Sequence, residues 1–433
     1  MKESFIIQGL AGERSLAGEI AVGGAKNEAL KLMAAAILCK GVLELENMPG
    51  IEDVKRMAEI LQMLGAKVTC EGTRCTLDTS GIATGVIDRE LARSLRSSVV
   101  LTGPLLARMC SISFPHPGGD LIGERPVDFF IEGFEKMGAV VEVADGEYKV
   151  SAPGGLKGAD IFFRWVSVTA TETLMMAAVL AEGTTTLRNV AMEPEVVDLA
   201  RFLEAAGAKI SGIGTPTLVI EGAPSTSSGQ GVLEPKGPWR VIPDRIEAGS
   251  FLILGALAAK ELHITQCEPE HLRMLRELLA HTGVAIEAGK DSLTITAAGS
   301  AKRGAMSLKT HEYPGFPTDL QAPMVVYLTQ AEGESKVFET IFEGRLNYTQ
   351  DLVRMGADIQ LWNPHQASIK GPTPLRGATL ESPDIRAGLA FLIAALIAEG
   401  ESTLENIYHI DRGYSRIEER FSALGASIKR ISV

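Results

Sequence analysis

The sequence predicts an α/β fold made of six repeats of about 72 residues, packed as two lobes of three repeats each. A short phrase, in which a helix ends, glycine follows and a strand begins, recurs along the whole chain. Its glycines are Gly65, Gly138, Gly207, Gly283, Gly356 and Gly425. Glycine ends helices because it adopts the left-handed conformation without steric cost. Each glycine therefore marks the end of one helix and the start of one strand.

Each repeat is expected to read helix, strand, helix, strand, strand. Amphipathic runs such as 52–64 and 195–206 supply the helix that ends at a repeat glycine. Apolar helices that close on a turn and a strand supply the first half of the repeat. They are clearest at 32–47, 174–189 and 389–406, and looser near 98–113, 250–265 and 322–339. The run 387–398 is apolar on nearly every face, so we expect it to be buried on all sides.

Six repeats exceed one ordinary core, which favours two lobes. We expect one lobe over 25–242, and the other over 1–24 together with 243–433. A stretch rich in Ser, Gly and Pro at 223–238 is a candidate linker, and a long surface loop inside one lobe is the alternative.

Composition excludes several classes of protein. With 42 Lys and Arg against 54 Asp and Glu, the net charge of −12 disfavours a nucleic-acid binder but leaves room for a local cationic pocket. The longest apolar run, 387–398, is shorter than the ~20 residues of a membrane span, and no signal peptide is evident. Five cysteines without metal-site spacing indicate reduced thiols in a cytosolic protein, with Cys70 and Cys75 in one strand-like stretch.

Cationic residues mark a candidate anion site. Lys26 opens an apolar helix, where backbone N–H groups favour an anion, although a solvated lysine is the simpler interpretation of that residue alone. Three arginines are expected in loops near helix starts: Arg125, Arg345 and Arg412. Any one of them, taken alone, is more simply interpreted as a charged residue on the surface. Together with Lys26 and Arg96 they are able to hold a phosphate and a carboxylate.

The loop HPGGDLIGERP, residues 116–126, surrounds Asp120 with glycines. Flexible glycines beside an ionisable group suit a lid that delivers a catalytic residue. A turn in which Asp120 bonds its own backbone is the alternative.

Five phrases, in this order and on a sixfold repeat, resemble the enolpyruvyl transferase family in its UDP-N-acetylglucosamine branch: VGGAKNEAL, PGGDLIGERPVD, PDRIEAGSF, FPTDLQA and IYHIDRGYSRIEER. The resemblance covers essentially the whole chain. It implies a two-lobed inside-out α/β barrel with the active site in the cleft between the lobes. It also implies transfer of the enolpyruvyl group of phosphoenolpyruvate to the 3′-hydroxyl of UDP-N-acetylglucosamine with release of phosphate. This is the first committed step of peptidoglycan synthesis, in the cytoplasm. No metal site is evident in the sequence, and no cofactor is expected.

The resemblance also implies roles for single residues. Phosphoenolpyruvate would contact Lys26, Arg125 and Arg412, with Arg96, Arg345 and Arg386 in the same cleft. The nucleotide sugar would contact Asn27, the uridine run Arg125, Pro126, Val127 and Asp128, the diphosphate turn Ser167, Val168 and Thr169, and Ile341. Asp120 would protonate the methylene carbon of phosphoenolpyruvate, which needs a raised pKa, and Asp319 would take the hydroxyl proton. An N-terminal helix cap formed with Thr318 is the plainer interpretation of Asp319.

Three positions depart from the family pattern. Asp120 stands where cysteine is commonest, Thr169 where glycine is frequent, and Trp165 where lysine is frequent. Because fosfomycin alkylates the loop thiol, we hypothesise that Asp120 makes the protein insensitive to it.

Three alternatives remain open. The shikimate-pathway enolpyruvyl transferase shares the fold but would carry Gly-Ser-Lys-Ser near the first helix, where this chain has GGAKNEAL. A binding or regulatory paralogue without turnover would explain the departures, although the full cationic set argues against it. A structural solenoid would explain the repeats, but the loops differ strongly from one repeat to the next.

Overall fold

The computed structural model describes residues 3–116, 118, 127–223, 233–296 and 303–432. These residues form two compact units. The central unit holds the described residues of 24–118 and 127–242, and the terminal unit holds those of 3–23 and 243–432. Gly24 thus belongs to the central unit, whereas we expected it in the other lobe. Each unit has its own hydrophobic core, and the described residues of the two cores do not overlap.

Helices account for the buried centre of each unit. Those of the central unit are α1 (Lys26–Ala35), η1 (Ala36–Leu38), α2 (Glu52–Met63), α3 (Arg89–Ser94), η2 (Arg96–Leu101), α4 (Thr102–Met109), α5 (Asp128–Lys136), α6 (Val168–Ala178) and α7 (Pro194–Ala205). Those of the terminal unit are α8 (Arg245–Ala258), η3 (Pro269–Leu272), α9 (Arg273–His281), η4 (Thr318–Leu320), α10 (Gln321–Leu328), α11 (Thr349–Arg354), α12 (Ile385–Ile397), α13 (Tyr408–Asp411) and α14 (Ile417–Ala423).

Strands form the outer layer. Those of the central unit are β3 (Val42–Glu46), β4 (Lys67–Glu71), β5 (Arg74–Asp78), β6 (Ser111–Pro115), β7 (Val140–Ala144), β8 (Glu147–Ser151), β9 (Asp160–Phe162), β10 (Thr184–Arg188), β11 (Lys209–Ser211), β12 (Thr217–Glu221) and β13 (Trp239–Arg240). Those of the terminal unit are β1 (Glu3–Gln8), β2 (Leu16–Ala21), β14 (Ala259–Thr265), β15 (Ile286–Ala288), β16 (Ser292–Thr296), β17 (Ser307–Lys309), β18 (Gly333–Phe338), β19 (Asp358–Asn363), β20 (Gln366–Gly371), β21 (Thr379–Glu381), β22 (Glu401–Glu405) and β23 (Ser427–Ser432).

The six repeat glycines all have a positive φ, between 88° at Gly138 and 112° at Gly207. They follow α2, α5, α7, α9, α11 and α14, and they precede β4, β7, β11, β15, β19 and β23. The predicted repeat is therefore confirmed, because each glycine ends a helix in the left-handed conformation.

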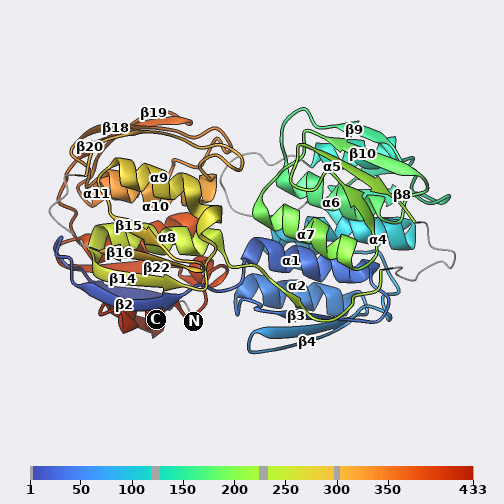
Figure 1. Ribbon diagram of the computed structural model, residues 1–433, viewed down its shortest axis with the longest axis horizontal. Helices are drawn as coiled ribbons and strands as arrows, with labels where there is room; N and C mark the ends of the chain where they lie inside the picture. Colours follow the sequence, from blue (N-terminus) through green and yellow to red (C-terminus); the bar gives the residue numbers. More distant parts are fainter. Residues whose placement is uncertain (1–2, 117, 119–126, 224–232, 297–302, 433) are drawn as a thin grey trace. The chain divides into compact units, whose positions relative to one another are not determined.

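Apolar helices lie inside each unit, and the sheets lie outside them (Figure 1). In the terminal unit α8, α10 and α12 contact one another, and every residue of the three is buried. In the central unit α1, α4 and α6 occupy the corresponding places, with η2 in contact with all three. The prediction that 387–398 is buried on all sides is confirmed, since α12 has no polar face.

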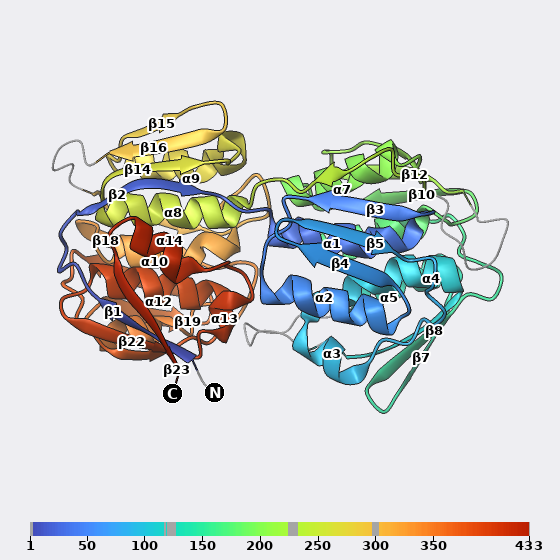
Figure 2. The ribbon, with the colours of Figure 1, turned by 90° about the horizontal axis from the view of Figure 1, so that it is seen from below.

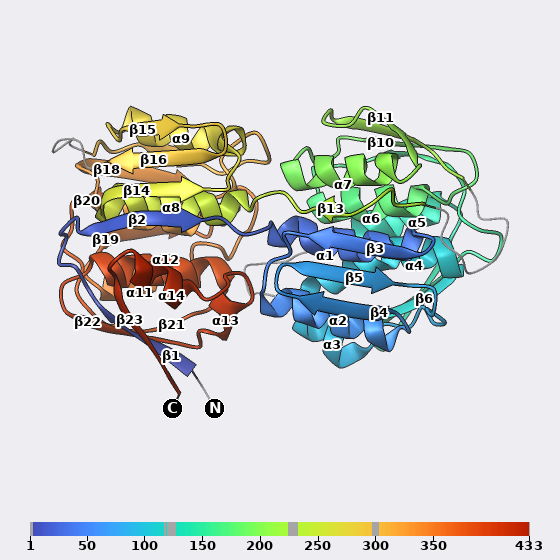
Figure 3. The ribbon, with the colours of Figure 1, turned by 60° about the horizontal axis from the view of Figure 1, so that its bottom comes forward.

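Within the described residues the strands form six sheets, three in each unit. A typical sheet has the order β17-β18-β20-β19, in which one parallel pair is followed by an antiparallel hairpin. The N-terminal strand β1 supplies the missing strand of the last repeat, and it pairs with both β22 and β23 (Figure 3). The first and last described strands, β1 and β23, therefore lie in one sheet of the terminal unit.

Within the described residues, the chain passes between the units after Gly23 and after Ile242. Strand β2 precedes α1 in sequence but pairs with β14 in the terminal unit (Figure 2). Strand β13 precedes α8 but pairs with β3 in the central unit. The described part of the Ser-rich stretch lies in the central unit, where Leu233 and Lys40 are joined by a backbone hydrogen bond. The passage therefore comes after Ile242, beyond that stretch.

The expectation of five reduced thiols is wrong for one pair. Cys70 on β4 and Cys75 on β5 form a disulfide, whereas Cys39, Cys110 and Cys267 are free. The two cysteines face each other because Gly72, with φ +58°, turns what reads as one strand into a hairpin. None of the helices in the described part of the chain is long and apolar enough to cross a membrane.

Candidate functional site

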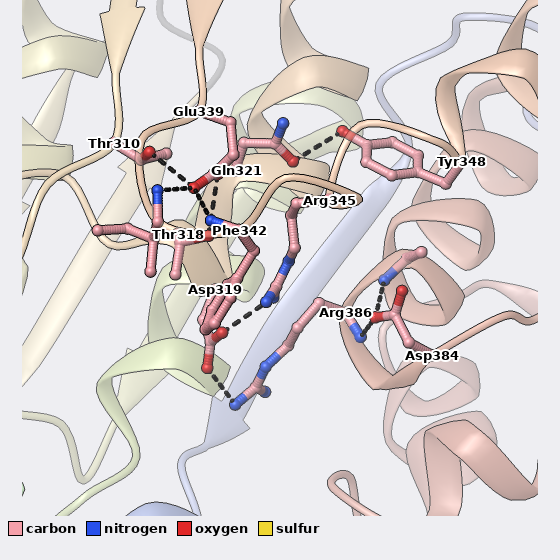
Figure 4. A network of polar contacts seen from close by, with 12 residues as sticks. Thr310, Thr318, Asp319, Gln321, Glu339, Phe342, Arg345, Tyr348, Asp384 and Arg386 are labelled. Carbon is pink, nitrogen blue, oxygen red and sulfur yellow. Dashed lines mark hydrogen bonds and ion pairs between the residues drawn. The ribbon is translucent and has the colours of Figure 1, made fainter. Parts of the chain in front are cut away.

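Asp319 lies at the centre of a polar network in the terminal unit (Figure 4). Its Oδ1 accepts a hydrogen bond from Arg345 Nη2 at 2.9 Å, and its Oδ2 accepts one from Arg386 Nη2 at 2.8 Å. Asp319 does not cap a helix, because Pro317 is the N-cap residue of η4 and makes no side-chain cap bond. The plainer interpretation of Asp319 is therefore wrong, since the carboxylate is committed to two guanidinium groups.

Both guanidinium groups are held from a second side. Arg386 Nη1 donates to Tyr414 Oη at 2.9 Å, and its backbone N–H donates to Asp384, which caps α12. The guanidinium of Arg345 lies 5.5 Å from the ring centroid of Phe342. The side chains of Arg345 and Arg386 are only 5% and 7% exposed, whereas that of Asp319 is 24% exposed. The network thus presents its carboxylate to the outside and keeps its cations behind it.

These ion pairs shift the acid–base properties of the network. Burial alone would raise the pKa of Asp319, but Arg386 and Arg345 outweigh it and hold that pKa well below its usual range. Burial would lower the pKa of Arg386, yet Asp319 raises it well above its usual value. Burial raises the pKa of Tyr414 to about 12, so this hydroxyl stays protonated at neutral pH.

Two further predicted residues lie on the same unit. Ile341 stands on the segment 340–345 that carries Arg345, and its backbone N–H donates to Glu339. Arg412 ends α13, is buried, and precedes the Arg386 partner Tyr414 by two residues. Within this unit the fold therefore brings Asp319, Arg345 and Arg386 into direct contact and places Ile341 beside them.

A cavity of about 390 Å³ adjoins this network within the terminal unit. It is bounded by η3, α9 and the segment 313–320, and Pro317 and Leu320 on either side of Asp319 contribute to its wall. Arg245 and Tyr313 also line it, with the guanidinium 5.7 Å from the ring centroid.

In the central unit, Lys26 is the first residue of α1 and is buried rather than solvated. Its Nζ lies 2.6 Å from Asp53 Oδ2, with side-chain exposures of 9% and 2%. Asn27 follows it in the first turn of α1. The ammonium and the N-terminal end of α1 both carry positive charge, which the carboxylate of Asp53 partly offsets.

The remaining predicted residues of this unit also lie at helix starts. Arg96 begins η2, and its Nη1 donates to Gly118 O at 3.3 Å. Val127 and Asp128 begin α5. Ser167 caps α6 through Ala170 N at 3.3 Å, and Val168 and Thr169 form the first turn of that helix. Asp120, Arg125 and Pro126 lie outside the described residues.

Several buried partners of the predicted residues were not themselves predicted from the sequence. Glu339, Tyr414 and Asp53 are buried partners of predicted residues, and only their burial reveals them. Trp165, which departs from the family pattern, packs edge-on against Phe129 with ring centroids 4.4 Å apart. Among the described residues, no group of three or more His, Cys, Asp or Glu side chains is placed to hold a metal ion.

The family model and the relatives that match this chain are all named as carboxyvinyltransferases, although their names give different acceptor substrates. A family model described as EPSP synthase (3-phosphoshikimate 1-carboxyvinyltransferase) matches residues 10–421. A UDP-N-acetylglucosamine 1-carboxyvinyltransferase of Koribacter versatilis is 44% identical over 99% of this chain and 96% of its own length. The protein of the same name from Desulfosudis oleivorans is 41% identical over 97% of this chain and 98% of its own.

Solved structures support the fold. The enolpyruvyl transferase NikO from Streptomyces tendae covers 100% of this chain and 99% of its own, with a TM-score of 0.87 and 24% identity. EPSP synthase from Acinetobacter baumannii covers 100% of both chains, with a TM-score of 0.72 and 17% identity. These two likenesses show the predicted enolpyruvyl transferase fold. By its family match and its relatives, the chain belongs to the enolpyruvyl transferase family, in the group named UDP-N-acetylglucosamine 1-carboxyvinyltransferase.

Proposed function

We propose that this protein transfers the enolpyruvyl group of phosphoenolpyruvate to the 3′-hydroxyl of UDP-N-acetylglucosamine and releases phosphate. The observation that carries the proposal is near-full-length similarity to relatives named for this reaction, at 41–44% identity. The Asp319 network supports it, because a carboxylate and two buried guanidinium groups suit proton transfer beside an anion. In the cell this reaction would be the first committed step of peptidoglycan synthesis, in the cytoplasm.

The reaction balances as an addition followed by an elimination. The 3′-oxygen forms a bond to C2 of phosphoenolpyruvate, the methylene carbon C3 gains a proton, and the hydroxyl proton goes to a base. The tetrahedral intermediate then loses phosphate from C2 and a proton from C3, which restores the double bond. Phosphate and the enolpyruvyl ether are the products.

Asp319 is the proposed acceptor of the hydroxyl proton. Since two arginines hold its pKa well below the usual range, Asp319 is ionised, and so able to accept a proton, throughout the neutral pH range. A base this weak takes the proton only when the attacking oxygen has become acidic, after the C–O bond has begun to form. Asp120 is the proposed donor to C3.

Lys26 and the helix N-termini are the proposed phosphate ligands. Lys26 at α1 and Ser167 at α6 combine the positive ends of helix dipoles with groups that donate hydrogen bonds. The proposed site residues come from both units, so we propose that residues of the two units act on the same pair of substrates. Arg125, Arg412 and Arg96 would complete the cationic set around phosphoenolpyruvate.

The identity of residue 120 leads to a separate prediction about inhibition by fosfomycin. A carboxylate is a much poorer nucleophile than a thiolate toward the fosfomycin epoxide, so the protein is expected to keep its activity after preincubation with the drug. The substitution Asp120→Cys should introduce sensitivity, measured as time-dependent loss of turnover. Full inactivation of the unaltered protein would contradict the expectation.

Phosphate release tests the proposed function. Purified protein is incubated with phosphoenolpyruvate and either UDP-N-acetylglucosamine or 3-phosphoshikimate, and free phosphate is measured. We expect phosphate release in the reaction that contains UDP-N-acetylglucosamine and none in the reaction that contains 3-phosphoshikimate. Release with 3-phosphoshikimate would support the second candidate, which the name of the matching family model favours. Binding of the nucleotide sugar without any release would indicate a paralogue that lacks turnover.

A further inference from the structure

Glu339 is a fully buried acidic residue directly after β18, and none of the site roles discussed so far uses it. Its side chain accepts four hydrogen bonds from three separate segments (Figure 4). Oε1 accepts from Ile341 N at 2.8 Å, from Phe342 N at 3.2 Å and from Thr310 Oγ1 at 3.0 Å. Oε2 accepts from Thr318 Oγ1 at 2.9 Å. A buried side chain with this many partners fixes the segments that it joins.

Two of these three segments carry the network around Asp319. Thr318 is the residue before Asp319 in η4. Ile341 and Phe342 begin the turn that leads to Arg345, whose backbone N–H donates to Phe342 O at 3.2 Å. Glu339 therefore holds the segment of Asp319 through Thr318, and it holds the segment of Arg345 through Ile341 and Phe342.

The backbone of Glu339 is itself fixed by hydrogen bonds. The backbone N–H of Glu339 donates to His365 O at 2.8 Å, and its carbonyl oxygen accepts from His365 Nδ1 at 2.9 Å. Thr310 is tied to the neighbouring Thr340 by two more hydrogen bonds, of 2.8 and 2.6 Å. Movement of Glu339 relative to the sheet would break several hydrogen bonds at once, so its carboxyl group is held in one position.

We propose that Glu339 is a positioning residue, which sets the distance between Asp319 and Arg345 by holding η4 and the segment 340–345 on one side chain. The proposal rests on the proposed function, because the geometry it fixes is that of the proton acceptor. Glu339 itself takes no part in the chemistry. Its effect is on the alignment of Asp319 with the hydroxyl that it deprotonates.

Two substitutions separate positioning from general stability. In Glu339→Gln the amide oxygen still accepts from Ile341 and Phe342, and the amide NH₂ donates to Thr318, whose hydroxyl accepts equally well. Glu339→Ala removes all four bonds. Ser335→Ala is the matched control, because Ser335 is also fully buried on β18 and loses one accepted bond, from Met306 N at 3.2 Å.

Kinetics give the first readout. Glu339→Ala is expected to lower kcat by about 100-fold while the KM for UDP-N-acetylglucosamine changes only a few-fold, because misplacement of a reacting group by about 1 Å has that effect on rate. Glu339→Gln should stay within about fivefold of the unaltered kcat, and Ser335→Ala within about twofold. Equal losses of kcat in the glutamine and alanine variants would overturn the proposal.

Hydrogen exchange gives a readout that does not depend on the reaction. The amides of Ile341 and Phe342 should exchange about 10- to 100-fold faster in Glu339→Ala than in Ser335→Ala, and remain protected in Glu339→Gln. Equal exchange in the alanine variant and the control would overturn the proposal. If the unaltered protein releases no phosphate, the proposed function has failed, and the exchange comparison still decides the role of Glu339.

A milder variant covers the case in which Glu339→Ala does not fold. Thr318→Val removes only the bond to Oε2, next to Asp319. It should lower kcat about tenfold and leave exchange at residues 341 and 342 unchanged. An unaltered kcat would show that the position of Asp319 does not depend on Glu339.

Discussion

Replacing Asp319 by asparagine tests the buried charge network directly. The carboxylate bonds Arg345 at 2.9 Å and Arg386 at 2.8 Å, and both guanidinium groups are almost fully buried. In Asp319→Asn two buried cations face a neutral amide, whose oxygen accepts only from one of them. Breaking a buried ion pair costs about 3–5 kcal/mol. Because Asp319 is 24% exposed, we expect a loss of about 3 kcal/mol, at the lower end of that range.

The assay is urea unfolding followed by circular dichroism, with Asp411→Asn as the control. Asp411 also makes two bonds to an arginine, Arg430, but that side chain is 26% exposed and keeps Glu3 and Glu418 as partners. The control should therefore lose about 1 kcal/mol or less. Equal losses in Asp319→Asn and Asp411→Asn would refute the view that burial makes the Asp319 network costly to break.

The pH dependence of this difference has a definite sign. The pKa of Asp319 is lower in the folded protein than in the unfolded chain, where it is about 3.9. Its stabilising contribution is therefore fully present above pH ~3.9 and is lost as pH falls through the lower folded value. The stability difference between unaltered protein and Asp319→Asn should stay constant from pH 5 to pH 9. A difference that grows with acidity would contradict the assignment.

Three further substitutions test other parts of the account. Gly103→Ala would place a Cβ atom 2.1 Å from the carbonyl oxygen of Thr173 in α6, so urea unfolding should show a loss of about 1–3 kcal/mol in the free energy of unfolding. In the control Gly154→Ala the new Cβ atom meets nothing within 4 Å, and the free energy of unfolding should change by less than ~0.5 kcal/mol. Burial raises the pKa of Glu172 to about 7, so the stability that this residue contributes is fully present below its unfolded pKa of ~4.3 and is lost as pH rises through 7. In a carboxyl NMR titration, one side-chain resonance should have a midpoint near pH 7 and be absent from Glu172→Gln. A midpoint below pH ~5 would contradict the raised pKa. Asp53→Asn removes the charged partner of Lys26, 2.6 Å away, and should lower kcat/KM for phosphoenolpyruvate about tenfold, whereas an unchanged value would argue against a role for Asp53 in placing the lysine.

The repeat and its buried helices could be predicted because they depend on local patterns. A glycine after an amphipathic run, as at Gly207, fixes where a helix ends whatever surrounds it. The apolar faces of α12 likewise leave burial as the only stable place for that helix. These features depend on residues that are neighbours in the sequence, so no knowledge of the tertiary packing was needed.

The arrangement of the site could be predicted only in part. Asp319 was expected at the site, but its two partners are 26 and 67 residues away, and no local pattern pairs it with them. Glu339 resembles any acidic residue at the end of a strand, and most such residues are exposed. The hairpin that joins Cys70 to Cys75 was missed because Gly72 interrupts the strand pattern only briefly.

Mass spectrometry of the nucleotide sugar after reaction is the most direct test of the proposed function. Incubation of the purified protein with UDP-N-acetylglucosamine and phosphoenolpyruvate should convert the sugar nucleotide to a species heavier by one enolpyruvyl group less the replaced hydrogen. One phosphate should appear for each molecule converted. A nucleotide sugar of unchanged mass, together with an enolpyruvyl adduct of 3-phosphoshikimate in the parallel reaction, would contradict the account.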